Sequence, residues 1–212
     1  LNDPSVRGGI VIHVAPGIYR LSEPLFIRPE DSGTAESPTM ILGDINGETV
    51  LSGGIRVDGW QKAGEIKGLP AAAKGKVWEA DVPQTGDGVL NFRQLWVNNI
   101  KAVRARQADA PLMDRILSWD HASETCWIPK PEGVDITNAD GMEMFIHQWW
   151  AIAMLRIKKA VVRGDSVQLS FWQPESRVES EHPWPAPFIS KKTGNSAFYL
   201  TNSIRFLNRP GE

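Results

Sequence analysis

The spacing of hydrophobic and polar positions changes along the chain. Between residues 10 and 51 the apolar residues form short runs bounded by Gly, Pro, Asp or Asn: Ile10–Val14, Ile18–Leu21, Leu25–Ile27, Met40–Leu42 and Val50–Leu51. In the first run Ile10, Ile12 and Val14 alternate with other residues, which is typical of a β-strand. No hairpin turn joins two long alternating runs here. The pattern therefore fits a parallel β-solenoid, whose coils each bury a narrow apolar face, or equally a sandwich of short strands.

Longer alternating strands begin after a surface excursion over residues 61–75. They are Val77–Val82, Phe92–Val97, Ile100–Ala105, Leu155–Val162 and Val167–Trp172. Asn98-Asn99 separates two of them and suits a type I′ hairpin turn, because Asn tolerates positive φ. Arg163–Ser166 reads as a second hairpin turn, whereas Leu112–Leu117 has room for one or two helical turns at most. These are signatures of antiparallel pairing.

The patterns together predict an all-β protein with two architectures. Residues 1–60 are expected to form a solenoid-like start. Residues 61–196 are expected to form an antiparallel β body, which residues 197–212 follow. Because one or two coils cannot bury a continuous core, the antiparallel part must supply most of the stability.

Composition narrows the class of protein. The chain has 212 residues, 42% of them apolar and 23% charged, as in an ordinary soluble globular protein. Its formal net charge of -2 gives no basic stripe for nucleic acid, and no apolar run reaches the length of a membrane span. The single cysteine, Cys126, excludes an intrachain disulfide and is expected to be a small buried filler.

Metal and nucleophile signals are weak. Asp135–Gly141 resembles a calcium loop, but aligning Gly141 with the glycine of an EF-hand loop places Ile136 and His147 at ligand positions, so an Asx turn is expected instead. The four histidines have no ligand spacing, and no Gly-x-Ser-x-Gly elbow is present. We therefore expect no metal and no cofactor.

Paired carboxylates would suit glycoside hydrolysis, in which one acts as acid and the other as nucleophile or base. Asp114, Asp120 and Glu124 lie near Trp119 and Trp127 in the sequence. Isolated acids of this kind are usually solvated or cap backbone N–H groups. The sequence thus assigns no catalytic residue.

Tryptophan is abundant, with nine residues against two tyrosines. Trp149, Trp150, Trp172 and Trp184 are candidates for stacking on sugar rings. A place within an alternating strand favours a core role for four tryptophans, namely Trp78, Trp96, Trp127 and Trp172. Trp184 differs because Pro183 and Pro185 hold it in a loop, and it is the candidate substrate-binding residue.

Several of these segments carry a family resemblance. The first consists of Pro16-Gly-Ile-Tyr19, Asp31-Ser-Gly-Thr34, Met40-Ile-Leu42, Leu51-Ser-Gly-Gly54 and Gly59-Trp60. It resembles the opening coils of right-handed parallel β-helix proteins from polysaccharide-degrading bacteria. The block from Val77 to Gln107, with its tryptophan strand, hairpin and Ala105-Arg106, is similar to the insertion domain of glycoside hydrolase family 141. The closing stretch from Ala197 to Glu212 resembles the return from that insertion. The resemblance thus implies that residues 1–60 form the first coils of a right-handed parallel β-helix, residues 61–196 an antiparallel, β-sandwich-like insertion domain, and residues 197–212 the return into the β-helix.

The resemblance implies the N-terminal part of a secreted, periplasmic or extracellular enzyme that degrades oligo- or polysaccharides, similar to α-fucosidases and xylanases. It places the catalytic carboxylates on later coils, beyond residue 212, so residues 1–212 alone are expected to be inactive. Both ends are expected to be trimmed. Three alternatives stay open: a non-catalytic carbohydrate-binding module, a structural insertion, and part of a β-helix polysaccharide lyase.

Overall fold

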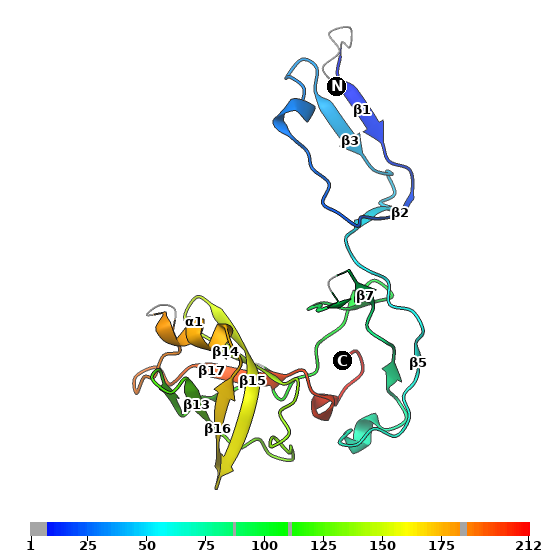
Figure 1. Cartoon of the computed structure of the whole chain (residues 1–212). Coiled ribbons are helices and arrows are strands. Elements are labelled where there is room, and N and C mark those ends of the chain that lie inside the picture. Colours follow the sequence, from blue (N-terminus) through cyan, green and yellow to red (C-terminus); the bar gives the residue numbers. More distant parts are fainter. Residues whose placement is uncertain (1–7, 87, 110–111, 183–185) are drawn as a thin grey trace. The chain divides into compact units, whose positions relative to one another are not determined.

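The protein is described here by a computed structural model, which covers residues 8–86, 88–109, 112–182 and 186–212. The chain divides into two compact units. We call Leu1–Trp60 with Ala80–Leu90 the coil unit, and Gln61–Glu79 with Asn91–Glu212 the sheet unit. Each is described by itself (Figure 1). No helix in the described part of the chain has the length and apolar character needed to cross a membrane.

The coil unit consists of short strands, and its two longest pairs are parallel. Its strands are β1 Ile10–His13, β2 Gly17–Arg20, β3 Thr39–Leu42, β4 Thr49–Ser52, β7 Gln84–Thr85 and β8 Gly88–Val89. β1 pairs with β3 from Ile10 opposite Thr39, and β2 pairs with β4 from Gly17 opposite Thr49. The second pass of the chain thus lies along the first, strand on strand. This pairing excludes an antiparallel sandwich for these four strands.

Side chains at the corners hold the two passes together. Thr49 Oγ1 donates to the Val14 carbonyl at 3.0 Å and accepts from the Asp44 N–H at 2.9 Å. The 3₁₀ turn η1, Pro29–Asp31, is capped where the Arg28 N–H donates to Asp31 Oδ2 at 3.0 Å. The predicted strand at residues 25–27 is wrong, since this segment has no strand pairing. It precedes Arg28 and Pro29, where the chain turns.

The sheet unit is dominated by one seven-stranded antiparallel sheet, in the order β11-β17-β14-β15-β16-β13-β12. The strands are β11 Asp114–Arg115, β12 Ser118–Asp120, β13 Thr125–Pro129, β14 Glu143–His147, β15 Ile152–Arg163, β16 Ser166–Phe171 and β17 Ala197–Thr201. Minor pairs join β5 Gln61–Lys62 to β6 Trp78–Glu79 and β9 Trp96–Val97 to β10 Ile100–Lys101. The prediction of an all-β protein is confirmed.

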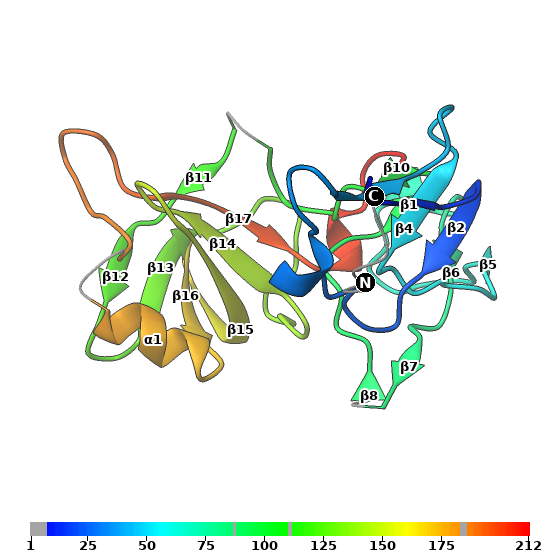
Figure 2. The same ribbon diagram turned by 90° about the horizontal axis from the view of Figure 1, so that it is seen from above.

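The sheet curls until its two edges meet in one segment. Residues 114–120 contain both β11, which pairs with β17, and β12, which pairs with β13. The change of partner occurs between adjacent residues. The Ile116 N–H donates to the Ser196 carbonyl at 3.1 Å, and the Leu117 N–H donates to the Trp127 carbonyl at 2.8 Å. This segment, for which the sequence predicted at most a short helix, therefore closes the sheet on itself and protects both edges (Figure 2).

β15 makes the second corner of the curled sheet. Its first half pairs with β14 and its second half with β16, and the register shifts between Ile157 and Lys159. A β-bulge of this kind adds one residue to a strand and increases its local twist. Ala153, Leu155 and Ile157 point into the core before the bulge, and Ala160 after it. Consequently Lys158 and Lys159 are both exposed.

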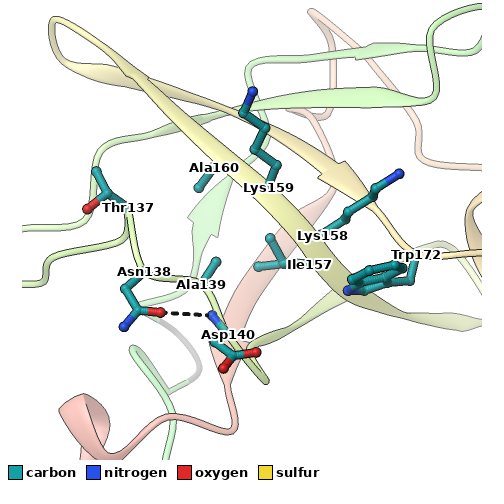
Figure 3. Close-up of a pocket in the computed structure, with 9 residues that line it drawn as sticks. All are labelled: Thr137, Asn138, Ala139, Asp140, Ile157, Lys158, Lys159, Ala160 and Trp172. Atoms are coloured by element: carbon teal, nitrogen blue, oxygen red, sulfur yellow. Dashed lines mark hydrogen bonds between the residues drawn. The ribbon is translucent and has the colours of Figure 1, made fainter.

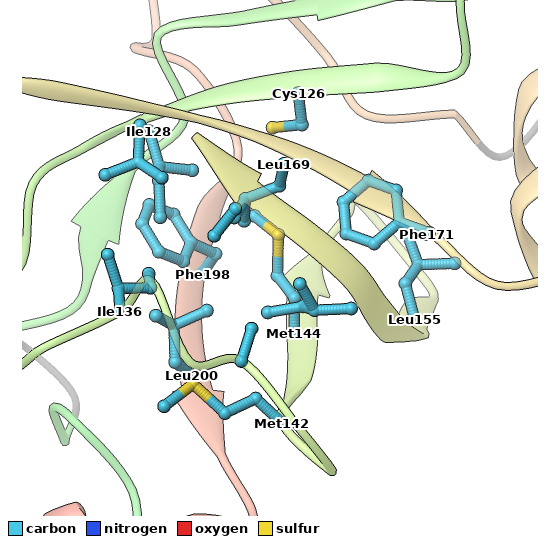
Figure 4. Packing of buried hydrophobic residues seen from close by; sticks show 14 of the residues in the cluster. Cys126, Ile128, Ile136, Met142, Met144, Leu155, Leu169, Phe171, Phe198 and Leu200 are labelled. Atoms are coloured by element: carbon cyan, nitrogen blue, oxygen red, sulfur yellow. The ribbon is translucent and has the colours of Figure 1, made fainter. Parts of the chain in front are cut away.

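The core lies inside the curled sheet (Figure 4). Alternate residues of neighbouring strands supply it. Phe198 and Leu200 come from β17, and Val167 and Leu169 from β16, all with no measurable solvent exposure. Cys126 of β13 is equally buried, and burial raises the pKa of its thiol to about 12. The prediction of a buried, unreactive cysteine is confirmed.

Turns and one α-helix, the only one among the described residues, complete the unit. Asn98 and Asn99 both have positive φ, at 49° and 62°, between β9 and β10, as predicted for a type I′ hairpin. The hairpin of β15 and β16 is also confirmed. The helix α1, Glu175–Glu181, was not predicted. Its sequence has no regular apolar stripe, and it follows Trp172-Gln-Pro174 directly after β16.

The units differ from the predicted boundaries at 60/61 and 196/197. Residues 80–90 belong to the coil unit, and β17 lies inside the sheet between β11 and β14. Because Phe198 and Leu200 fill the core, residues 197–201 are part of the antiparallel body. The segment that follows is also tied to this unit, since the Val103 N–H donates to the Gly211 carbonyl at 2.8 Å.

Candidate functional site

An open groove of about 250 Å³ lies beside β15, across from the loop that precedes β14 (Figure 3). One rim is that loop, and the other is the bulge of β15 together with Trp172, which follows β16. Its lining consists of Thr137, Asn138, Ala139, Asp140, Ile157, Lys158, Lys159, Ala160 and Trp172. The groove therefore combines one large aromatic side chain with charged and amide groups.

The loop rim is held by Asx turns. The Thr137 hydroxyl and the Thr137 N–H both donate to Asp135 Oδ1, the N–H at 3.0 Å. The bond from the hydroxyl lowers the pKa of the Asp135 carboxyl most, and the bond from the N–H lowers it further. Asn138 Oδ1 accepts from the Asp140 N–H at 3.4 Å. Ile136 and Ala139 are buried and anchor the loop from below. The predicted Asx turn at 135–141 is confirmed, and it forms a wall of the groove.

The aromatic rim depends on strand phase. In β16, Val167, Leu169 and Phe171 point inward, so the next residue, Trp172, points outward and is 50% exposed. Its backbone N–H donates to the Arg156 carbonyl at 2.9 Å, which fixes the ring beside the bulge. The expectation that Trp172 belongs to the core is wrong. The two-residue alternation of β16 could have indicated this exposure, because Trp172 is out of phase with the three inward residues.

Lys158 covers part of the same ring. Its Nζ lies 5.5 Å from the centroid of the Trp172 ring, within the range of a cation–π contact. In Figure 3 Lys158 and Trp172 are drawn next to each other, whereas Lys159 leaves the strand at another point. Asp140 lies on the opposite rim, in the loop that also carries Asn138. A ligand in the groove would meet a ring, a cation and an anion.

This arrangement is suited to a polar ligand with an apolar face. An indole ring presents a negative face to weakly positive C–H groups, and amide and carboxylate groups orient hydroxyls. A pyranose ring has both features: C–H bonds on its faces and hydroxyls around its edge. Asp140 is the one carboxylate among the described residues that line the groove.

The other candidate aromatics are placed differently. Trp184, the substrate-binding candidate, lies outside the described residues. Trp149 and Trp150 occupy the tip of the β14–β15 hairpin, both exposed, with ring centroids 5.7 Å apart. Trp127 is half-buried in β13, whereas Trp78 and Trp96 are exposed, so the core role predicted for the latter two is wrong.

The three acids singled out in the sequence make structural hydrogen bonds. Asp120 Oδ1 accepts from the Ala122 and Ser123 N–H groups, and the bonds to Ser123 lower the pKa of its carboxyl most. Glu124 Oε2 accepts from Gln173 and from Ser176, each at 2.7 Å. Asp114 Oδ2 accepts from Gln107 at 2.7 Å. These acids do not gather into a catalytic pair.

Glu179 was missed by sequence reasoning. Burial raises the pKa of this carboxyl to about 7, although a hydrogen bond from Gln148 opposes the shift. Raised carboxyl pKa values occur at catalytic acids, but also in structural contacts. Glu179 does not line the groove of Figure 3; it packs α1 onto the start of the β14–β15 hairpin. Within the described residues no group of three or more His, Cys, Asp or Glu side chains is arranged to hold a metal ion.

Comparisons with known proteins agree on the family. A solved structure described as "Glycoside hydrolase" matches the whole chain at 45% identity with a TM-score of 0.80, and the chain spans 35% of that protein's length. A comparison with curated proteins finds no significant match. Residues 75–212 match the family model described as the GH141 insertion domain. The chain therefore belongs to the family defined by the insertion domain of GH141 glycoside hydrolases.

Proposed function

We propose that the chain is a non-catalytic portion of a polysaccharide-degrading glycoside hydrolase of the α-fucosidase or xylanase type. The catalytic carboxylates would lie in parts of the enzyme other than residues 1–212. The similarity over the full chain to a glycoside hydrolase of nearly three times its length supports this. The engagement of Asp114, Asp120 and Glu124 in structural hydrogen bonds is consistent with it. Such an enzyme would act in the periplasm or outside the cell.

The coil unit is proposed to be the beginning of a right-handed parallel β-helix. The in-register parallel pairs β1–β3 and β2–β4 support this, because a solenoid stacks equivalent strands of successive coils. Its apolar strand residues are exposed, as expected for coils that pack against further coils. The sheet unit is then an insertion into this solenoid.

The sheet unit is proposed to contact the glycan at the groove between Asp140 and Trp172. The observation that carries this proposal is the outward, half-exposed Trp172 facing a polar loop across an open space. The ring gives the groove an apolar surface, which its amide and carboxylate groups do not supply.

Affinity gel electrophoresis on a panel of soluble polysaccharides tests the proposal. We expect retardation of the unmodified chain on at least one polysaccharide, loss of retardation in Trp172→Ala, and no hydrolysis by either protein. Trp78→Ala is the matched control: Trp78 is similarly exposed, at 55%, and also has a lysine over its ring, but it does not line the groove. Equal retardation of the Trp172 and Trp78 variants would contradict a role for the groove, and turnover by the chain would contradict a non-catalytic one.

A structural role for the insertion is the second candidate. The closed antiparallel sheet with its own core favours it, because such a body is able to shape or shield one end of a binding cleft without touching substrate. Deleting the sheet unit from the complete enzyme would then alter specificity or stability while hydrolysis persists. Elimination by a β-helix lyase is a third possibility, distinguished by the unsaturated product that absorbs in the ultraviolet.

A further inference from the structure

The two lysines beside the groove are cations without an anionic partner. Neither Lys158 nor Lys159 forms an ion pair with a described acidic residue, although most described arginines near the sheet do. The two are adjacent on the outside of β15 because of the bulge at this point, which breaks the alternation that would have placed one of them inward. Bulges often direct side chains toward a binding site. The bulge here concentrates positive charge on one rim.

Lys158 is the lysine that faces the aromatic ring. Its ammonium lies over Trp172 at 5.5 Å from the centroid, and this is its only described polar or aromatic contact. A comparable pair elsewhere in the sheet unit is different. Lys62 lies 5.3 Å from the centroid of Trp78, but its Nζ also donates to the Gly75 carbonyl at 3.1 Å. The Lys158 ammonium therefore keeps its donors for a ligand, whereas Lys62 is already committed to the backbone.

Asp140 is the one acid among the described residues that line the groove, and it stands on the opposite rim (Figure 3). Its side chain is exposed. A carboxylate accepts hydrogen bonds from hydroxyls and repels other anions. A sugar in the groove would thus turn its hydroxyls toward Asp140 and any negative substituent toward Lys158. The two rims impose a polarity on the ligand.

We infer that this groove is a subsite for a uronic acid residue, whose ring stacks on Trp172 and whose carboxylate binds the Lys158 ammonium. The inference rests on the proposed glycan contact and narrows its ligand to acidic polysaccharides. A charge-assisted bond from an ammonium to a carboxylate is stronger than one to a neutral hydroxyl. Because the groove is open to solvent, the preference is modest and falls with salt.

The experiment compares acidic oligosaccharides with their carboxyl-reduced counterparts on the full chain. Oligogalacturonate and oligoglucuronate of equal length, each with its reduced neutral form, are titrated by calorimetry at low and at high salt. We expect each acidic form to bind about 5-fold to 10-fold more tightly than its neutral form at low salt, with the preference shrinking at high salt. Lys158→Gln should remove the preference, because it weakens the acidic forms to about the affinity of the neutral ones. Trp172→Ala should weaken both forms.

Matched variants distinguish the uronic acid subsite from the more general proposal that the groove binds a glycan. Lys62→Gln, which alters the comparable lysine–tryptophan pair outside the groove, should leave all affinities unchanged. Neutral binding that depends on Trp172, without preference for the acidic form, would overturn the inference and keep the glycan groove. An acidic preference unaffected by Lys158→Gln would overturn it as well. Absence of binding to all four probes would overturn the uronate subsite, and retardation of the chain on another polysaccharide would then show that the proposed function survives.

Discussion

In the sheet unit Phe198, Leu200 and Leu169 are fully shielded from solvent, whereas in the coil unit no described residue is buried. Both units are rich in apolar strands, so composition does not explain the contrast. The difference is in pairing. The antiparallel sheet curls until residues 114–120 join its two edges and enclose a core. The parallel strands of the coil unit pair once each and enclose nothing.

The contrast shows what each architecture needs for stability. A closed antiparallel sheet satisfies its backbone and buries its side chains with its own strands. A parallel coil buries its apolar face only against the next coil, so two passes leave most of that face in water. We therefore expect the sheet unit to supply nearly all the cooperative stability of residues 1–212.

The first test of this contrast uses one substitution in each unit. Leu200→Ala in β17 should lower the free energy of unfolding by about 2–5 kcal/mol, because it leaves a cavity in a closed core. Leu42→Ala in β3 removes the same atoms from a side chain that is already 42% exposed, and should cost less than about 1 kcal/mol. Urea unfolding followed by circular dichroism measures both. Similar losses at the two positions would mean that the coil unit has a core of its own.

Sequence patterns predicted the strands and turns of the two units better than they predicted how the antiparallel sheet closes on itself. Two-residue alternation and turn residues predicted the β15–β16 hairpin and the Asn98-Asn99 turn, because both depend on local geometry. Short runs between corners left a parallel solenoid and a sandwich of short strands equally open for β1 to β4, and the family resemblance favoured the coils. The edge-joining role of residues 114–120 was not predicted, since it depends on which strands lie at the two edges of a sheet assembled from distant segments.

The groove was harder to predict than the fold, although its signals were present. Trp172 was assigned to the core because it ends an apolar strand, yet it is out of phase with Val167, Leu169 and Phe171. The lysine pair at 158–159 interrupts the inward series of Leu155 and Ile157, which is how a bulge appears in a sequence. That the 135–141 loop lies across from both could not be derived, because the juxtaposition comes from sheet curvature.

The second test concerns backbone packing in the coil unit. Gly9 has a φ of +89°, and an added Cβ would lie 2.3 Å from the Pro38 carbonyl oxygen, next to the first hydrogen bond between β1 and β3. Gly9→Ala should destabilise the β1–β3 pair by about 1–3 kcal/mol. Gly47→Ala is the control, since Gly47 has a similar φ of +74° but no atom within 4 Å of the added Cβ.

Hydrogen exchange of the β1 and β3 amides detects this local effect. The sheet-unit amides should exchange as in the unmodified chain, because stability is expected to be separable between the units. Faster exchange throughout the sheet in Gly9→Ala would show instead that the units unfold together. If Gly9→Ala and Gly47→Ala were equally destabilising, the destabilisation would come from the positive φ alone and not from contact with Pro38.

The third test compares an ion pair from each unit. Arg93 donates to Glu143, whose side chain is only 8% exposed and also lies 3.8 Å from Arg104. Arg93→Met should cost about 1 kcal/mol, because it removes one partner of a buried carboxylate. Arg56→Met breaks the exposed Arg56–Asp58 pair of the coil unit, and its effect should be close to zero. Thermal unfolding at low ionic strength measures the difference. A larger loss for Arg56→Met would contradict the view that burial gives these pairs their value.

The smallest effect is expected from pH, and it belongs to the sheet unit. Burial raises the pKa of Glu179 to about 7 from its ordinary value of 4.5, so the folded state favours the protonated carboxyl. Its stabilising contribution is fully present below about pH 4.5 and is lost as the pH rises through about 7. Glu179→Gln keeps the shape without the charge and should raise Tm at pH 8 by about 2–4 °C, a value reduced by the solvent contact that the side chain retains. At pH 4.5 the variant and the unmodified chain should melt at the same temperature.

Glu181→Gln on the same helix is the control, because that side chain is exposed and its contact with Arg177 at 3.7 Å is weak. A Tm gain for Glu179→Gln that is equal at both pH values would mean that the amide improves packing against Gln148 and that ionisation has no role. A gain confined to high pH would show that ionisation of the Glu179 carboxyl lowers the stability of the folded chain. The coil unit has no buried carboxyl among its described residues, so this pH dependence should be absent from the exchange rates of β1 to β4.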